Sequence, residues 1–148
     1  MGYSDQKYYA RPLELAAQNM TFGTATASGT NTLASPVSNP LPAFVNRTSI
    51  KAIQVVVTTA VAVGAVAESI VFLNGTSTFG VVTMTGGTAT AGQVFSGVMT
   101  TANSTFAVAG QPTYELIVQT ATASGAVTGS FNIYLEQQEL PVNPGSGT

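Results

Sequence analysis

The stretch ESIVFLNGTSTFGVVTM, residues 68–84, carries the strongest short-range signal for a β-hairpin in the chain. It places Asn74-Gly75 between two apolar runs. Asn-Gly is favoured in a type I′ turn because both central residues need a positive φ, which Asn and Gly tolerate best. We therefore expect two antiparallel strands joined at Asn74-Gly75.

Strand-like stretches continue on both sides of this hairpin. They are β-branched or alternate apolar with polar side chains, and they cover residues 20–27, 49–63, 93–101, 104–110, 113–123 and 125–140. We expect 93–101 and 104–110 to pair around Ala102-Asn103, and the last two to pair around Ser124-Gly125. About seven to nine strands spaced 8–12 residues apart are typical of an antiparallel sandwich or barrel. The chain is therefore predicted to be all-β, as an antiparallel β-sandwich.

Two other segments carry weaker expectations. Residues 29–42 are predicted to be a loop because Pro36, Pro40 and Pro42 disfavour helix. Lys51 alternates onto the same face as Ile53 and Val55, so the start of that strand is expected at an edge or rim of the sandwich.

The composition is unusual in its charge. Charged residues make up 7% of the 148 residues, against about 25% in ordinary domains. Cysteine and histidine are both absent, so disulfides and the usual general base are excluded. Residues 52–148 contain no cation, and residues 69–114 contain no charge at all. A weakly charged surface promotes association, so we expect a homo-oligomer. The few charges form no broad basic surface, so no nucleic-acid partner is expected.

A membrane partner is not expected. The longest apolar stretch, residues 52–67, is interrupted by Gln54, Thr58 and Thr59 and is shorter than the roughly 20 residues that a spanning helix needs. It is instead interpreted as a buried strand.

The first residues, MGYSDQKYYARPLEL, differ from the rest of the chain. Four of the ten charged residues and three of the five tyrosines lie here. Tyrosine and arginine are enriched where proteins contact partners, so the candidate docking residues are Tyr3, Lys7, Tyr8, Tyr9 and Arg11. Such an arm could dock on a neighbouring subunit, cover an open end of its own domain, or be disordered.

Three parts of the chain are distinguished. Residues 1–19 are expected to form an N-terminal arm that could hold a short helix after Pro12, residues 20–140 the β-sandwich, and residues 141–148 a flexible tail.

Catalytic motifs are incomplete. Residues 87–92 have the glycine spacing of a phosphate loop, but Gln93 and Val94 stand where Lys and Ser or Thr are needed. Glu136 and Glu139 could be proposed as paired carboxylates, and the end of a strand in water explains them more simply. No catalytic residue, cofactor site or metal site is therefore predicted, and the protein is not expected to be an enzyme.

A small cysteine-free chain rich in Thr, Ala, Gly and Val, with an aromatic and basic arm from Tyr3 to Glu14, resembles the decoration, or cement, proteins of tailed-bacteriophage capsids. That resemblance implies a non-enzymatic, jelly-roll-like fold that binds the outside of the major capsid protein and reinforces the shell. Such proteins are often trimers or dimers, so a homotrimer is favoured. It also implies a location on the virion capsid surface after synthesis in the host cytoplasm.

Other classes stay open. A virion fibre, spike or tail component that binds host glycans would favour exposed aromatic and Asn or Asp side chains on its loops, whereas the loops here are mainly Thr, Gly and Ala. A bacterial surface or pilus-like subunit is the other alternative.

Overall fold

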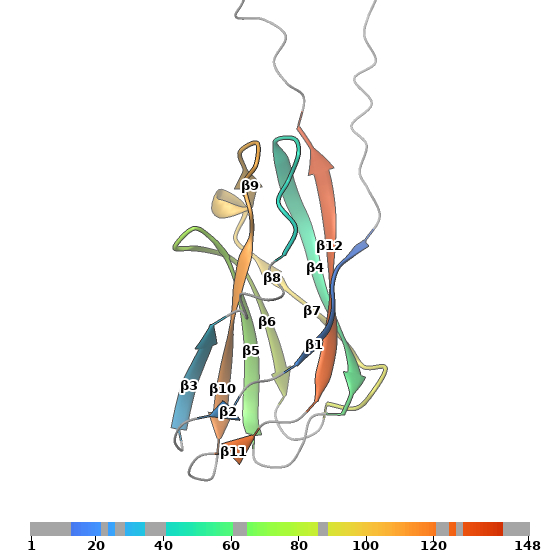
Figure 1. The fold of residues 1–148 in the computed structure, drawn as a ribbon, viewed down its shortest axis with the longest axis vertical. Helices are drawn as coiled ribbons and strands as arrows, with labels where there is room; N and C mark the ends of the chain where they lie inside the picture. Colours follow the sequence, from blue (N-terminus) through green and yellow to red (C-terminus); the bar gives the residue numbers. More distant parts are fainter. Residues whose placement is uncertain are drawn as a thin grey trace, which may run out of the picture.

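The fold is described from a computed structural model that places residues 13–21, 24–25, 29–34, 41–60, 65–85, 89–120, 125–126 and 129–140 (Figure 1). Within these ranges lie twelve strands and one 3₁₀ helix. They are β1 (Glu14–Thr21), β2 (Thr24–Ala25), β3 (Gly29–Ala34), β4 (Thr48–Thr59), β5 (Ala65–Asn74), β6 (Ser77–Thr85), β7 (Val94–Ser96), β8 (Val98–Met99), η1 (Thr101–Asn103), β9 (Thr105–Phe106), β10 (Thr113–Thr120), β11 (Gly125–Ala126) and β12 (Ser130–Glu139).

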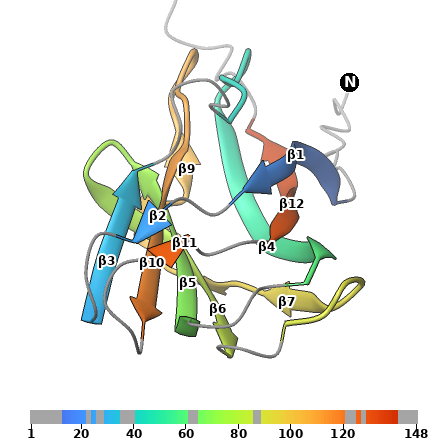
Figure 2. The same ribbon diagram turned by 60° about the horizontal axis from the view of Figure 1, so that its bottom comes forward.

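Two antiparallel sheets pack face to face (Figures 1 and 2). One has the order β1-β12-β4-β7, with β9 also paired to β4, and the other has the order β3-β10-β5-β6-β8. The short pair β11-β2 lies at the end of the sandwich opposite the one where β12 ends. The predicted all-β sandwich is confirmed, with short edge pieces raising the strand count above the expected seven to nine.

The strand order is that of a jelly roll. If the two-residue edge strand β8 is left aside, the other eight strands on the two sheet paths can be numbered one to eight in chain order, as β1, β3, β4, β5, β6, β7, β10 and β12. One sheet then has the order 1-8-3-6 and the other 2-7-4-5. Two Greek keys folded over one another produce this arrangement, because the chain crosses between the sheets after most strands.

The hairpin predicted within residues 68–84 is present as β5 and β6. Its turn is shifted by one residue from the expectation, because Asn74 pairs with Ser77 and the two central residues are Gly75 and Thr76. Within this turn only Gly75 has a positive φ, +62°, which fits a type II′ turn rather than type I′. The Asn74 side chain instead donates to the carbonyl oxygens of Asn103 and Thr105, at 3.1 and 2.9 Å.

Several local expectations are wrong. The helix considered after Pro12 is a strand from Glu14 onward, because pairing with β12 outweighs the weak helix propensity of so short a segment. Residues 29–34, expected to be a loop, form β3 against β10. The prolines that suggested the loop all follow this strand, and Pro36 and Pro40 lie outside the described residues.

Two predicted hairpins are also wrong. The segments 113–123 and 125–140 do not pair with each other: β10 lies between β3 and β5, and β12 lies between β1 and β4 in the opposite sheet. The stretch 93–101 splits into β7 and β8, and β9 pairs with β4 rather than with them. Jelly-roll connections join strands of opposite sheets, so adjacency in sequence does not give the pairing.

Lys51 does not mark an edge strand, because β4 lies between β12 on one side and β7 and β9 on the other. The β4–β12 ladder shifts register between Glu136 and Gln137, which leaves Lys51 as an extra residue of β4. This bulge lets Ile50 and Ile53 both face the core while Lys51 stays exposed.

Gly97 is the point where the chain passes from one sheet to the other, between β7 on β4 and β8 on β6. A Cβ at this position would lie 3.1 Å from Ile53 Cβ and 3.2 Å from Val82 Cγ2. We predict that Gly97→Val lowers the free energy of unfolding by about 1–3 kcal/mol through overpacking. Urea denaturation should show this loss, whereas Ser96→Val, at an exposed neighbour, should change stability by less than about 0.5 kcal/mol. Equal effects of the two substitutions would contradict a close approach at Gly97.

The core contains a chain of aromatic rings. Phe44 packs edge-to-face on Phe106 at 5.2 Å between ring centroids, Phe106 on Phe79 at 5.2 Å, Phe79 on Phe72 at 6.0 Å, and Phe72 on Tyr114 at 6.2 Å. All five rings are buried. This row of aromatic rings connects β5, β6, β9 and β10 with the segment that precedes β4. Both sheets and one end of the sandwich therefore share one core.

Candidate functional site

The five predicted docking residues, Tyr3, Lys7, Tyr8, Tyr9 and Arg11, lie outside the described residues, so their positions stay a prediction. The structure does place the root of their segment. The chain enters β1 at Glu14, which pairs with Leu135 of β12. The arm is therefore attached at the side of β12, near the end of the sandwich where β12 finishes (Figure 1).

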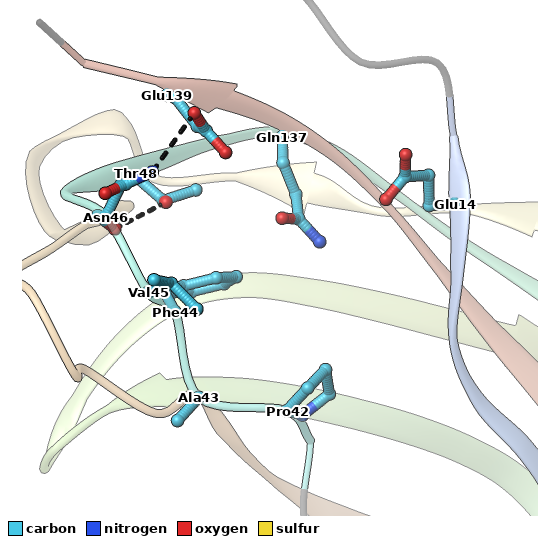
Figure 3. Close-up of a pocket in the computed structure, with 9 residues that line it drawn as sticks. All are labelled: Glu14, Pro42, Ala43, Phe44, Val45, Asn46, Thr48, Gln137 and Glu139. Carbon is cyan, nitrogen blue, oxygen red and sulfur yellow. Dashed lines mark hydrogen bonds between the residues drawn. The ribbon is translucent and has the colours of Figure 1, made fainter.

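A pocket of about 400 Å³ opens at this root (Figure 3). Its walls are residues 42–46 and Thr48 on one side, and Glu14, Gln137 and Glu139 on the other. Three strands therefore contribute to it: the start of β1, the end of β12 and the beginning of β4. Sequence reasoning had named Glu14 as part of the arm and Glu139 as a strand end, and it had not joined them.

The segment before β4 forms the apolar wall of the pocket because it is fixed to the 107–111 turn. Phe44 N–H donates to the Gly110 carbonyl oxygen, and Ala109 N–H donates to the Phe44 carbonyl oxygen, both at 2.8 Å. The Gln111 side-chain amide donates to the Leu41 carbonyl oxygen at 2.7 Å. Leu41 and Phe44 are buried, whereas Val45 points to solvent with 84% of its surface exposed.

The polar wall follows from the alternation of β12. Phe131, Ile133 and Leu135 face the core, and the same face continues to Gln137 and Glu139. The core face of this strand thus changes from apolar to polar where the pocket opens. That change was the available sequence signal, and it could have identified Gln137 and Glu139 as pocket residues.

Hydrogen bonds fix the far side of the pocket. Asn46 Nδ2 donates to Glu139 Oε2 at 3.3 Å, and Thr48 Oγ1 donates to the Asn46 carbonyl oxygen at 2.8 Å. Leu140 N–H donates to the Arg47 carbonyl oxygen at 2.8 Å. In Figure 3 Gln137 lies between Glu139 and Glu14, and Pro42, Phe44 and Val45 lie across the pocket from it.

Three exposed apolar side chains lie on or next to the segments that form the pocket. Leu15 follows Glu14, Val45 lines the pocket, and Val108 lies on the turn that is hydrogen-bonded to Phe44. Leu15, Val45 and Val108 are 47%, 84% and 64% exposed. We call these three residues the apolar collar. A second exposed pair, Val94 and Val98, lies on the edge strands β7 and β8.

Glu136 and Glu139 do not act as a pair in one site. They are three positions apart on β12, so their side chains leave opposite faces of the sheet, and only Glu139 lines the pocket. Within the near-match to a phosphate loop, residues 89–93 are described. They form a turn in which Thr90 N–H donates to Gln93 Oε1 at 3.2 Å.

One further ionisable group is buried, away from the pocket. Glu68 of β5 is fully inaccessible, and its two carboxyl oxygens have no hydrogen-bond partner among the described residues. It faces the core with Ile70 and Phe72 and is cross-strand from Met84. Burial raises the pKa of the Glu68 carboxyl because the charged form loses its hydration.

The described residues contain no group of three or more His, Cys, Asp or Glu side chains placed to hold a metal ion. In the same part of the chain there is no helix with the length and apolar character to cross a membrane.

Comparisons with known proteins identify no relative. No protein-family model matches the chain, and neither a curated protein nor a solved structure shows significant similarity to it.

Proposed function

We propose that this protein is a non-enzymatic structural subunit of a virion that binds the outside of a tailed-phage capsid and stabilises the shell. Its partner is the major capsid protein, and its place is the capsid surface. The observation that carries the proposal is a jelly-roll sandwich whose body is almost uncharged and whose arm end exposes the apolar collar. Jelly rolls also serve as lectin and cupin domains, so the surface rather than the fold has to support the function.

The surface favours assembly for two reasons. First, the edge strands β7 and β8 expose Val94 and Val98, and they lie within the uncharged stretch 69–114. Free monomers usually protect sheet edges with charges, whereas a subunit covered by neighbours does not need them. Second, the collar residues Leu15, Val45 and Val108 are exposed apolar side chains, on β1, on the segment before β4 and on the turn bonded to that segment.

A shell stabiliser needs no chemistry at a single site. Weak contacts that are repeated on every copy by the symmetry of the shell add up to strong binding overall. In this proposal the arm residues Tyr3, Lys7, Tyr8, Tyr9 and Arg11 are the docking contacts, and the jelly roll is a rigid body that holds them at the shell surface.

Deletion of residues 2–11 tests the role of the arm. The deletion ends before Glu14, where β1 begins, so the sandwich keeps all its strands. We expect the truncated protein to remain folded, with a melting temperature within a few degrees of the full chain, and to lose co-sedimentation with capsids prepared without it. Circular dichroism checks the fold. A truncated protein that still binds shells at full affinity would contradict docking by the arm.

A further inference from the structure

We infer that the outer face of the β3-β10-β5-β6-β8 sheet is the contact surface for a second copy of this chain, packed sheet against sheet. Five side chains on this face carry the inference, and we call them the apolar face: Val71, Leu73, Val81, Val98 and Ile117. The inference goes beyond the proposed function, because it concerns contact between copies and needs no shell.

The register of the sheet brings these side chains together. Figure 2 shows β3, β10, β5 and β6 side by side. Val71 of β5 pairs with Val81 of β6 on one side and with Glu115 of β10 on the other. Val81 pairs in turn with Val98 of β8, so one row crosses four strands. The other two members of the apolar face lie two residues along from this row, on β5 and β10: Leu73 and Ile117.

The apolar face points away from the core. The alternate residues of β5, Ile70 and Phe72, are buried, and so are Val82 of β6 and Leu116 of β10. Successive side chains of a strand leave opposite faces of the sheet, so the apolar face lies on the outside. Its members on β5, β6 and β10 are half-buried among one another, and Val98 on the edge strand is 77% exposed.

The sequence of β5 has the pattern of a strand that is covered on both sides. Residues 70–73, IVFL, are apolar without interruption, whereas a strand with one wet face alternates apolar with polar side chains. The described strands of the two main sheets form two packed layers, so the opposite sheet covers the inner side chains of β5 and neither sheet covers the outer ones. A further surface is needed to complete the pattern.

The opposite sheet has no such face. The outward positions on its inner strands are mostly polar, and they are Gln54, Val56 and Thr58 on β4 and Asn132, Tyr134 and Glu136 on β12. Apart from Glu68 in the interior and Glu115 on β10, the described charged residues also belong to that side of the sandwich: Glu14, Arg47, Lys51, Glu136 and Glu139. An apolar outer face is therefore particular to one sheet and does not follow from the composition alone.

A second copy fits this face in area and in charge. Strands lie about 4.8 Å apart and each residue adds about 3.3 Å, so five strands with the eight residues of β10 cover about 600 Å². Two such faces together would bury about 1,200 Å², which is the lower end of the range for specific interfaces. Among its described side chains Glu115 is the one that ionises, so the face matches a flat neutral surface like itself better than a charged partner.

A two-fold axis parallel to the strands and midway between β5 and β6 gives this contact. It lays β5 of one copy over β6 of the other, so Val71 of each copy faces Val81 of the second copy. It also lays β10 over β8, which directs Glu115 to the edge of the second copy's sheet and away from the other Glu115. Sheets packed in this way lie about 10 Å apart with interlocking side chains. The product is a dimer, whereas the resemblance to decoration proteins favours a trimer.

Sedimentation velocity of the full-length protein tests the contact. We expect the wild type to form a dimer, and Val81→Lys to raise its dissociation constant at least about tenfold, because the ammonium group would be buried without a partner. Val56→Lys is the matched control. Val56 is also a half-buried, outward-facing valine on an inner strand, but it belongs to the opposite sheet, so this variant should dimerise as the wild type does.

Mixing two variants tests the geometry of the dimer. An equimolar mixture of Val81→Lys and Val71→Glu should dimerise more tightly than either protein alone. The two-fold axis brings these positions together, so the mixed dimer holds an ion pair where each separate dimer holds two unpaired buried charges.

Three results would overturn the inference: a wild type that stays monomeric at high concentration, a Val56→Lys protein as weak as Val81→Lys, or a mixture no tighter than its components. If circular dichroism shows that Val81→Lys does not fold, Val98→Lys replaces it, because Val98 is highly exposed on an edge strand and lies outside the core. Normal dimerisation of Val98→Lys would then contradict the inference.

Shell binding is measured separately, so the two proposals can fail independently. A monomeric wild type whose binding to shells is lost in Val81→Lys would assign the apolar face to the shell and overturn the second copy as its occupant. A wild type that dimerises as expected and leaves shells bare would support the inference and contradict the proposed function.

Discussion

Replacing Glu68 with methionine is expected to raise the free energy of unfolding by about 1–3 kcal/mol at acidic pH, and by more as the pH rises. The side chain is fully buried among apolar residues, and both carboxyl oxygens have no partner in the described part of the chain. Methionine has a similar length, and a methionine already occupies the cross-strand position, Met84. The substitution therefore removes a desolvated polar group with little change of volume.

The pH dependence follows from the direction of the pKa shift. Burial raises the pKa of Glu68 in the folded protein above that in the unfolded chain. Below the usual carboxyl range Glu68 is protonated in both states, so its ionisation lowers the free energy of unfolding by nothing. As the pH rises through the folded pKa, the free energy of unfolding falls because the unfolded chain ionises Glu68 more readily. The loss is about 1.4 kcal/mol for each unit by which the two pKa values differ. The neighbouring strand β10 carries a second carboxyl group, that of Glu115. The residues on either side of it, Tyr114 and Leu116, face the core, so Glu115 points away from the core and from Glu68.

Urea denaturation between about pH 4 and pH 8 measures this effect. The wild type should lose stability with rising pH across the window, Glu68→Met should be more stable throughout, and Glu68→Gln, which cannot ionise, should lose the Glu68 contribution to the slope. A wild-type slope that survives in Glu68→Gln would show that another group causes it.

Phe79→Ala should destabilise the fold by about 3–5 kcal/mol. Phe79 is fully buried and is the middle ring of the aromatic chain, in contact with Phe72 and Phe106. It occupies the bulge of β6, where the β5–β6 ladder shifts register between Phe72 and Leu73. Removing the ring leaves a cavity between strands that belong to both sheets, and the neighbouring rings cannot close it without moving strands.

The control for Phe79→Ala is Val81→Ala on the same strand. Val81 faces away from the core and is partly exposed, so its truncation should cost about 1 kcal/mol or less. Both free energies of unfolding come from chemical denaturation at one pH. A loss at Phe79 no larger than that at Val81 would contradict a single core built around the aromatic chain.

The sequence predicted which faces of the strands are buried, because alternation is a local property. Tyr114 and Leu116 in β10, and Phe131, Ile133 and Leu135 in β12, are buried as their spacing indicates. The hairpin around residue 75 was also predictable, since its two strands are joined by the turn itself. The shift of that turn was not, because it depends on hydrogen bonds from Asn74 to a distant segment, residues 103–105.

Pairing between distant strands could not be derived from local patterns. β10 and β12 alternate equally well and follow one another in sequence, yet they lie in opposite sheets. The segment 14–21 has good helix formers, and its strand state comes from β12, more than a hundred residues away. The bulge at Lys51 similarly reconciles Ile50 with Ile53, whose spacing fits no simple alternation.

The candidate site was predicted only in part. Composition pointed to the arm, because charge and tyrosine are concentrated there. The pocket at its root could not be found that way, because Pro42, Phe44 and Asn46 lie in a segment whose position depends on hydrogen bonds to residues 109–111 and on β12. Glu14 and Glu139 are brought to one pocket by the strand order, which local sequence patterns do not predict.

The central claim is that this jelly roll is a structural subunit bound outside a capsid shell. Cryo-electron microscopy of shells prepared without the protein, then mixed with the purified full chain, tests it most directly. We predict density for a β-sandwich of this shape at symmetry-related positions on the outer surface, with a connection from the β1 end of the sandwich to a neighbouring subunit. Shells whose surface stays bare after incubation with excess protein would contradict the claim.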